Sequence, residues 1–257
     1  METLGFKVIG SGNEPIIVMH EWLGDHSNYA PVIPYLNKND FKWIFTDLRG
    51  YGLSKNIQGE FTCREAANDV KNLINHLGLK DVHLVGHSMS AMVAQLIASE
   101  IKDKINSLVL VTPVPASGIK VSKEAEENLK KVIIDDLATT EAINSRTGNR
   151  YNSTWLKEKL SLSRKASTID ARTGYLKMFL HSDYSKEVKG LDVAVRVIVG
   201  EYDIPVFQKE QVEKLFSNWY SDLEIIKCSE SGHYPMLECP VFFASQLESF
   251  ILDGQNR

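Results

Sequence analysis

Residues 82–98 place a serine where the local pattern suits nucleophilic chemistry. The segment reads as a short apolar strand, a sharp turn that carries Ser88, and then a helix. A serine hydroxyl is a poor nucleophile at neutral pH, so a fold that uses it must hold it clear of the backbone, beside a base and facing oxyanion donors. Gly86 and Ser90 are small residues two positions either side, which lets strand and helix pack closely. Although Ser90 departs from the G-x-S-x-G pattern, the segment predicts a nucleophile elbow.

Two later segments supply an acid and a base. An apolar run over 195–199 ends shortly before Asp203, and residues 223–227 alternate like a strand before the loop that carries His233. Ser88, Asp203 and His233 therefore occur in the order serine, acid, histidine, each after an expected strand. This order and these settings predict a Ser-His-Asp triad.

Each of these residues also has an ordinary structural explanation. A G-x-S-x-S string can arise by chance, Asp203 could cap a helix before Pro205, and His233 could be a solvated loop residue. Chance would have to supply all three residue types in the right order and settings, so the joint pattern favours the triad. Glu201 is the competing acid.

Two further motifs extend the pattern toward the N-terminus. The apolar residues 16–19 are followed by His-Glu-Trp-Leu-Gly at 20–24, which looks like a His-Gly-x-x-Gly oxyanion loop. Residues 47–54, Asp-Leu-Arg-Gly-Tyr-Gly-Leu-Ser, closely match a D-x-R-G-x-G-x-S turn. With the elbow and the triad order, these motifs give the chain a resemblance to the α/β-hydrolase superfamily over most of its length.

The resemblance implies roles for two backbone groups. The oxyanion donors would be the N–H of Met89, after the nucleophile, and the N–H of Trp22 in the His20 loop. Glu21 stands where the family usually has glycine, and a carboxylate pointing into an oxyanion site would oppose the developing negative charge. We expect the Glu21 side chain to point away and to be tied to a turn.

The spacing of apolar runs predicts an α/β fold with a mostly parallel central sheet and helices on both faces. Strands are expected near residues 4–9, 16–20, 42–47, 82–86, 105–111, 194–199 and 223–227. The helix over 63–77 is expected to open with a capping box of Thr62 and Glu65.

The regular recurrence of apolar, strand-like runs stops between Val111 and Leu191, where the sequence becomes charged and helical in pattern. This is the position at which the family inserts a cap over the active site. Helices are expected over 122–134, 154–162 and 170–181. We expect a core formed by residues 1–113 and 188–257, with residues 114–187 inserted as a helical cap or lid.

The expected pocket is apolar and aromatic. The cap helix over 170–181 carries Tyr175 and Phe179 on one face, and His20 and Tyr234 lie near the expected site in sequence. These four side chains are the pocket candidates, although an apolar stripe at helical spacing is usually only packing. Such a pocket suits a small or medium acyl compound rather than a polymer.

Composition narrows the protein class and its partners. The chain has 257 residues with a formal net charge of −4, and 43% of them are hydrophobic, which suits one core with an insertion. No long basic run favours nucleic acid, and no apolar run approaches the length of a membrane span. The start lacks signal-peptide features, so we expect a cytoplasmic protein. The sequence leaves the oligomeric state open.

Neither cysteine nor histidine spacing predicts a cofactor. Cys63, Cys228 and Cys239 have no paired spacing, and their odd number argues against a disulfide framework. The seven histidines form no cluster with metal-ligand spacing. We therefore expect reduced cysteines, no metal and no cofactor.

The function favoured by these residues is hydrolysis of a carboxylic ester or lactone of a small to medium, largely apolar substrate through an acyl-enzyme on Ser88. Dehalogenases and epoxide hydrolases of the family carry aspartate at the elbow, so Ser88 disfavours them. Two alternatives stay open. The elbow is similar to those of the karrikin and strigolactone receptors and of the bacterial stress regulator RsbQ, which implies sensing with slow or no turnover. Cofactor-free dioxygenases and perhydrolases also share this scaffold.

Overall fold

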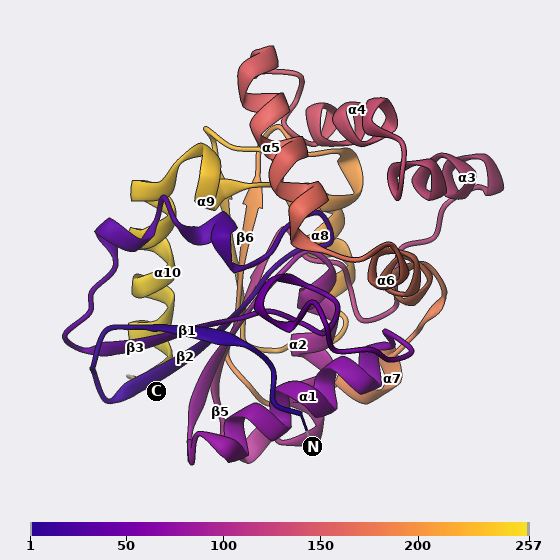
Figure 1. Cartoon of the computed structure of the whole chain (residues 1–257). Helices are drawn as coiled ribbons and strands as arrows, with labels where there is room; N and C mark the ends of the chain where they lie inside the picture. Colours follow the sequence, from indigo (N-terminus) through magenta and orange to yellow (C-terminus); the bar gives the residue numbers. More distant parts are fainter. Residues whose placement is uncertain (1, 256–257) are drawn as a thin grey trace.

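A seven-stranded sheet with helices on both faces forms the centre of the computed structural model, which describes residues 2–255 (Figure 1). The strand order is β1-β3-β2-β4-β5-β6-β7; β1 is antiparallel to β3, and the other neighbours are parallel. The strands are β1 (Phe6–Ile9), β2 (Glu14–Met19), β3 (Phe41–Thr46), β4 (Val82–His87), β5 (Ile105–Val111), β6 (Val195–Gly200) and β7 (Leu223–Cys228). The expected fold class and all seven expected strands are confirmed.

The central strands are covered from both sides, which explains their sequences. Every residue of β4 and β6 is buried, and so are all but one residue of β5. A parallel strand with both faces covered reads as a continuous apolar run rather than as an alternation. The edge strand β7 is only partly buried, and Glu224 and Lys227 are its exposed residues.

The helices are α1 (Cys63–His76), α2 (Met89–Glu100), α3 (Lys123–Val132), α4 (Asp136–Arg146), α5 (Ser153–Ala166), α6 (Ile169–His181), α7 (Ser185–Val188), α8 (Lys209–Phe216), α9 (Pro235–Glu238) and α10 (Pro240–Gln255). In Figure 1, α10 lies on one side of the sheet and α1 and α2 lie on the other. Among residues 2–255, no helix combines the length and the apolar character needed to cross a bilayer.

The start of α1 differs slightly from the expected capping box. Thr62 accepts a hydrogen bond from the Glu65 N–H at 3.2 Å, as expected. The Glu65 carboxylate, however, reaches back to the N–H of Phe61 at 2.7 Å rather than to that of Thr62. Phe61 has a positive φ of 55°, and this conformation turns its N–H toward the helix. The reciprocal hydrogen bond is therefore shifted by one residue.

Between β5 and β6 the chain forms the insert, which we define as residues 114–187. In Figure 1 the helices α4 and α5 lie beyond the end of the sheet toward which β6 points, and α3 and α6 lie to the right of the sheet. The three helices expected there are present as α3, α5 and α6, and α4 was not anticipated. Asp135 caps α4 by accepting from the Ala138 N–H at 2.9 Å.

Side-chain hydrogen bonds fix the turn over 47–54. Arg49 makes two hydrogen bonds of 2.6 and 2.7 Å to the carboxylate of Asp69 on α1. The Ser54 hydroxyl donates to the Asp47 carbonyl at 2.7 Å. These bonds hold the turn against the core.

One buried ion pair joins the insert to the core. The Lys159 ammonium on α5 lies 2.8 Å from Glu21 Oε1, in the loop after β2, and both side chains are almost inaccessible to solvent. Lys159 also donates to the Leu23 carbonyl at 3.0 Å, and the Leu23 N–H donates to Glu21 Oε2. Asn28 Nδ2 adds a bond of 3.0 Å to Glu21 Oε1. The Glu21 carboxylate is thus tied to its own turn.

Glu21 is ionised in this setting. Burial alone raises the pKa of a carboxyl group, but the charge of Lys159 and the hydrogen bonds from Lys159 and Leu23 outweigh it and lower the pKa of Glu21 to about 2. Removal of one partner would leave an uncompensated buried charge, which typically costs about 3–5 kcal/mol.

We therefore expect Lys159→Met to lower the free energy of unfolding by about 3–5 kcal/mol, measured by urea denaturation at pH 7. The double variant Glu21→Gln, Lys159→Met should recover a large part of this loss because no charge stays buried. Lys157→Met is the matched control, since Lys157 is exposed on the same helix; it should change stability by no more than about 0.5 kcal/mol. Equal effects of the two lysine variants would contradict the role of the ion pair.

Candidate active site

Ser88 occupies a strained turn between β4 and α2. Its backbone has φ 53° and ψ −112°, a conformation that residues with a Cβ rarely adopt. Gly86 must be glycine, because a Cβ there would lie 2.7 Å from Ala91 Cα. Ser90, which replaces the usual glycine, accepts from the His87 N–H at 3.0 Å and donates to the His87 carbonyl at 3.1 Å. The hydroxyl of Ser90 therefore stabilises the elbow.

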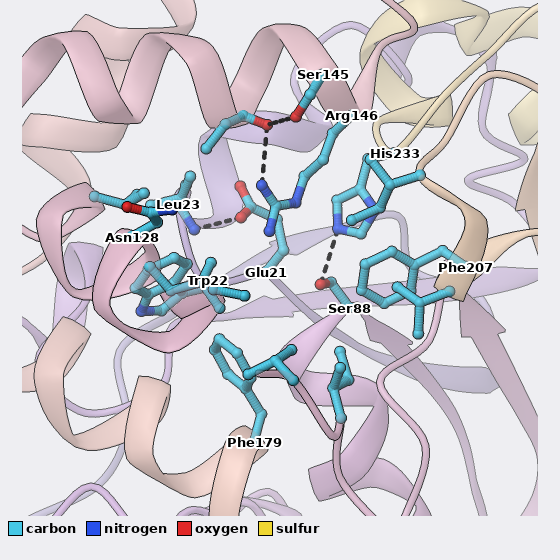
Figure 2. Close-up of a pocket in the computed structure, with 18 of the residues that line it drawn as sticks. Glu21, Trp22, Leu23, Ser88, Asn128, Ser145, Arg146, Phe179, Phe207 and His233 are labelled. Atoms are coloured by element: carbon cyan, nitrogen blue, oxygen red, sulfur yellow. Dashed lines mark hydrogen bonds between the residues drawn. The ribbon is translucent and has the colours of Figure 1, made fainter. Parts of the chain in front are cut away.

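The three residues picked out by their order lie in one hydrogen-bonded chain. His233 Nε2 is 2.9 Å from Ser88 Oγ, and His233 Nδ1 is 2.5 Å from Asp203 Oδ2. Figure 2 shows the imidazole of His233 directed at Ser88. All three side chains are buried or nearly so. Because a carboxylate only accepts, Nδ1 carries the proton when His233 is neutral, and Nε2 is left free to accept the serine proton.

The competing acid takes another partner. Glu201 is half-exposed and forms an ion pair with Lys227. Asp203 also accepts from the Ile204 N–H at 2.7 Å, so both of its oxygens have donors. The structure brings Asp203, and not Glu201, to His233.

The backbone of the His233 loop is held from several sides. Glu238 on α9 accepts from the N–H groups of Gly232 and Tyr234, both at 2.9 Å, and so brackets the histidine. The N–H of His233 itself donates to the Arg146 carbonyl at 2.8 Å, at the end of α4. The position of His233 therefore depends on a helix of the insert as well as on the core.

The two candidate oxyanion donors are backbone N–H groups from different segments of the chain. Met89 is the first residue of α2, where a backbone N–H has no partner within the helix. Trp22 follows Glu21, and its indole N–H donates to the Arg172 carbonyl at 2.9 Å. Neither backbone N–H is bonded to a backbone carbonyl within residues 2–255. Glu21 also lines the cavity described next, but both of its oxygens are occupied by the donors named above.

A cavity of about 610 Å³ opens above Ser88 and is lined mainly by apolar side chains. Phe179 and Tyr234, two of the four pocket candidates, are among the lining residues, together with Trp22 and Phe207. Figure 2 shows the rings of Phe179 and Phe207 on either side of Ser88. Phe207 also packs against the imidazole of His233, with ring centroids 4.6 Å apart.

The other two pocket candidates lie elsewhere and need correction. His20 is fully buried; its Nε2 accepts from the Leu48 N–H at 3.1 Å, and its ring packs on Tyr51. Tyr175 is fully buried as well and contacts the rings of Tyr51 and Phe61. Both side chains pack against Tyr51, and neither belongs to the lining of the cavity.

Helix α4 contributes lining residues that the sequence reasoning missed. Ala138, Glu141, Ala142, Ser145 and Arg146 all line the cavity. The apolar positions of α4 are few and scattered, so no stripe predicted a helix. The available signal was Asp135, a capping residue directly before Asp136, followed by residues that favour helices.

Two side-chain clusters outside the cavity lining have the residue types that bind metals or react with oxidants. Asp25, His26 and Asp47 offer ligand atoms within 4.8 Å of one another, but His26 Nδ1 already lies 2.6 Å from Asp47 Oδ2. The thiols of Cys228 and Cys239 are 2.9 Å apart, and a hydrogen bond from Cys239 lowers the pKa of Cys228 to about 6. All three cysteines are free.

His87 links the elbow to the His233 loop. Its Nε2 lies 2.8 Å from the His233 carbonyl, which also accepts from the Thr112 hydroxyl at 3.2 Å. A carbonyl only accepts, so His87 Nε2 carries a proton. Burial, together with the nearby His233, lowers the pKa of His87 to about 3. His87 is therefore neutral in the folded protein at neutral pH.

This depressed pKa makes stability depend on pH. Between pH 6.5 and 3 the unfolded chain protonates His87 and the folded protein does not, so the stabilisation is complete above pH 6.5 and is lost as the pH falls. From pH 7.5 to 5 the loss should be about 2 kcal/mol. His87→Gln, whose amide can still donate, should abolish this part of the pH dependence, as measured by urea unfolding at both values. An unchanged pH dependence would contradict the assignment.

Comparison with known proteins agrees with the fold. The family model described as alpha/beta hydrolase fold matches residues 14–141. A soluble epoxide hydrolase of Corynebacterium sp. (strain C12) is 34% identical over 110 residues, which are 43% of this chain and 38% of that protein. A pimeloyl-(acyl-carrier protein) methyl ester esterase of Legionella pneumophila (strain Paris) is 25% identical over 254 residues, 92% of this chain and 95% of that protein.

A solved structure repeats the architecture over nearly the whole chain. A thermophilic esterase from Thermogutta terrifontis, with malate bound, superposes with a TM-score of 0.83 at 24% identity and covers 98% of this chain and 93% of that one. The family match, the strand order with its single antiparallel edge, and the elbow after β4 lead to one conclusion: the chain belongs to the α/β-hydrolase superfamily.

Proposed function

We propose that this protein is a serine hydrolase that cleaves a carboxylic ester or lactone of a small to medium, largely apolar substrate through an acyl-enzyme on Ser88. The observation that carries the proposal is the hydrogen-bonded chain from Ser88 through His233 to Asp203 at the floor of an apolar cavity. A nucleophile, a base and an orienting carboxylate beside a substrate-sized space are the parts that acyl transfer needs.

The proposed chemistry has two stages. Ser88 Oγ attacks the ester carbonyl while His233 Nε2 takes the serine proton, and His233 then gives that proton to the leaving alcohol. Asp203 orients the imidazole and stabilises its cationic form. Water attacks the acyl-enzyme with His233 again as the base, which releases the acid and restores Ser88.

The N–H groups of Met89 and Trp22 are the proposed oxyanion donors. Met89 supports this role because it lies at the N-terminus of α2, where the helix dipole favours negative charge. Trp22 supports it because the neighbouring Glu21 and Leu23 are held by Lys159, which positions the loop backbone beside the cavity. The Glu21 charge is balanced by Lys159 and so opposes the oxyanion less than a lone carboxylate would.

The insert is the proposed lid of this site. We propose a core of residues 1–113 and 188–257 and a lid of residues 114–187. Helices α3, α4 and α6 supply much of the cavity wall, including Leu129, Ala142 and Phe179, and this wall supports a largely apolar substrate. The histidine loop depends on α4, so the lid also contributes to the geometry of the base.

The comparisons support ester hydrolysis at a coarse level. The Legionella relative and the Thermogutta structure are both named esterases, and each aligns with nearly all of this chain. The epoxide hydrolase match covers a minority of both chains. Serine at position 88 suits acyl transfer, because an alkoxide attacks a carbonyl and the resulting acyl ester is readily hydrolysed.

Ser88→Ala should abolish hydrolysis of p-nitrophenyl esters, tested from acetyl to octanoyl, without unfolding the protein. Asp203→Asn should lower kcat by about 10³- to 10⁴-fold with little change in KM, because the imidazole loses its orienting partner. Glu201→Gln is the matched control on the same loop and should retain the wild-type rate.

Full activity in Ser88→Ala would contradict the nucleophile, and a loss in Glu201→Gln equal to that in Asp203→Asn would contradict the acid. A single stoichiometric burst of p-nitrophenol from the wild-type protein, with no further turnover, would favour a receptor-like role instead.

A further inference from the structure

One partly buried cation in the cavity, Arg146, has no acidic partner among the described side chains. Arg146, the last residue of α4, lines the cavity, and Figure 2 shows its side chain extending inward above Ser88, between Glu21 and His233 in this view. Its Nη1 donates to the Ala142 carbonyl of its own helix at 2.9 Å. No carboxylate forms an ion pair with it in the part of the chain whose side chains the structure describes.

The other charges that line the cavity do not neutralise Arg146. The carboxylate of Glu21 is engaged by Lys159. Lys131 and Glu141 are exposed, and Lys131 donates to Asn128 at 3.0 Å. A guanidinium has five N–H donors in a planar fork, and among the described residues only the Nη1 nitrogen of Arg146 has a hydrogen-bond partner. The remaining donors are available to a ligand.

A hydrogen bond holds the backbone of Arg146, so the position from which its side chain extends is fixed. The Arg146 carbonyl accepts the N–H of His233 at 2.8 Å, so the end of α4 is attached to the loop that carries the base. A cation that starts beside His233 and extends into the cavity lies within the volume that an ester bound at Ser88 would occupy. The surrounding wall is mostly apolar, and such surroundings strengthen a charge-assisted hydrogen bond.

The geometry points to Arg146 as a carboxylate-binding residue, so that the preferred substrate is an ester that also carries an ionised carboxylate. This inference rests on the proposed esterase function and narrows its substrate class. An arginine fork matches a carboxylate through two parallel hydrogen bonds, and the aliphatic chain between the carboxylate and the ester would lie along the apolar wall. The carboxylate can belong to the acyl part or to the alcohol part of the ester.

Two matched substrate pairs test the inference and distinguish a carboxylate on the acyl part of the ester from one on the alcohol part. In the acyl arm, monomethyl adipate is compared with methyl hexanoate; in the alcohol arm, 5-acetoxypentanoate is compared with pentyl acetate. The wild-type protein should show the higher kcat/KM for the acid in at least one arm. Arg146→Met should lower the acid-to-neutral ratio of kcat/KM by about 10- to 100-fold, mainly through KM. Arg146→Lys should give an intermediate ratio, because it keeps the charge but loses the fork.

Lys131→Met is the matched control for general charge, since Lys131 lies in the same cavity wall but is exposed. It should leave the acid-to-neutral ratio within about twofold. The inference is overturned if neutral esters are preferred in both arms, if Arg146→Met leaves the ratio unchanged, or if Lys131→Met lowers it as much.

A binding measurement separates this inference from the proposed function. Isothermal titration of the Ser88→Ala protein with monomethyl adipate and with 5-acetoxypentanoate needs no turnover. At least one acid should bind, and Arg146→Met in the same background should weaken its binding by about 10-fold or more. Binding without wild-type hydrolysis would refute the esterase and retain the carboxylate site. Hydrolysis of neutral esters without binding of either acid would refute the carboxylate site and retain the esterase function.

Discussion

The strained backbone at Ser88 is the constraint on which the site depends. A residue with a Cβ held at φ 53° persists only when its surroundings impose that conformation, and here they do so from both sides. Gly86 allows α2 to approach β4 to a distance that a side chain would prevent, and Ser90 bonds both backbone groups of His87. As a result, the Ser88 hydroxyl lies between the end of β4 and the start of α2, and it faces the cavity.

The insert and the core share control of the groups around that hydroxyl. Lys159 on α5 holds Glu21 and Leu23, on either side of Trp22, and the Arg146 carbonyl at the end of α4 holds His233. A movement of the insert would therefore displace a proposed oxyanion donor and the proposed base together. These contacts give a structural reason for Glu21 at the position where the expected motif has glycine. Its carboxylate binds its own turn and anchors α5.

Much of the fold could be predicted because its signals are local. Buried parallel strands show as apolar runs, and the elbow, the acid and the histidine each follow a strand within a few residues. The contacts that complete the site are long-range: Glu21 and Lys159 are 138 positions apart, and no spacing rule relates them. Helix α4 has no clear apolar stripe, so Arg146 was not anticipated in the cavity. His20 opens the expected oxyanion loop and Tyr175 lies on an expected cap helix, but tertiary packing buries both side chains against Tyr51.

The most direct test of the account is to label the protein with a fluorophosphonate, which phosphonylates an activated serine, and to map the adduct by peptide mass spectrometry. The account predicts one adduct per chain, on Ser88, with loss of ester hydrolysis in step with labelling and no adduct in Ser88→Ala. Hydrolysis that persists in fully labelled protein, or labelling at another serine that removes activity, would contradict it.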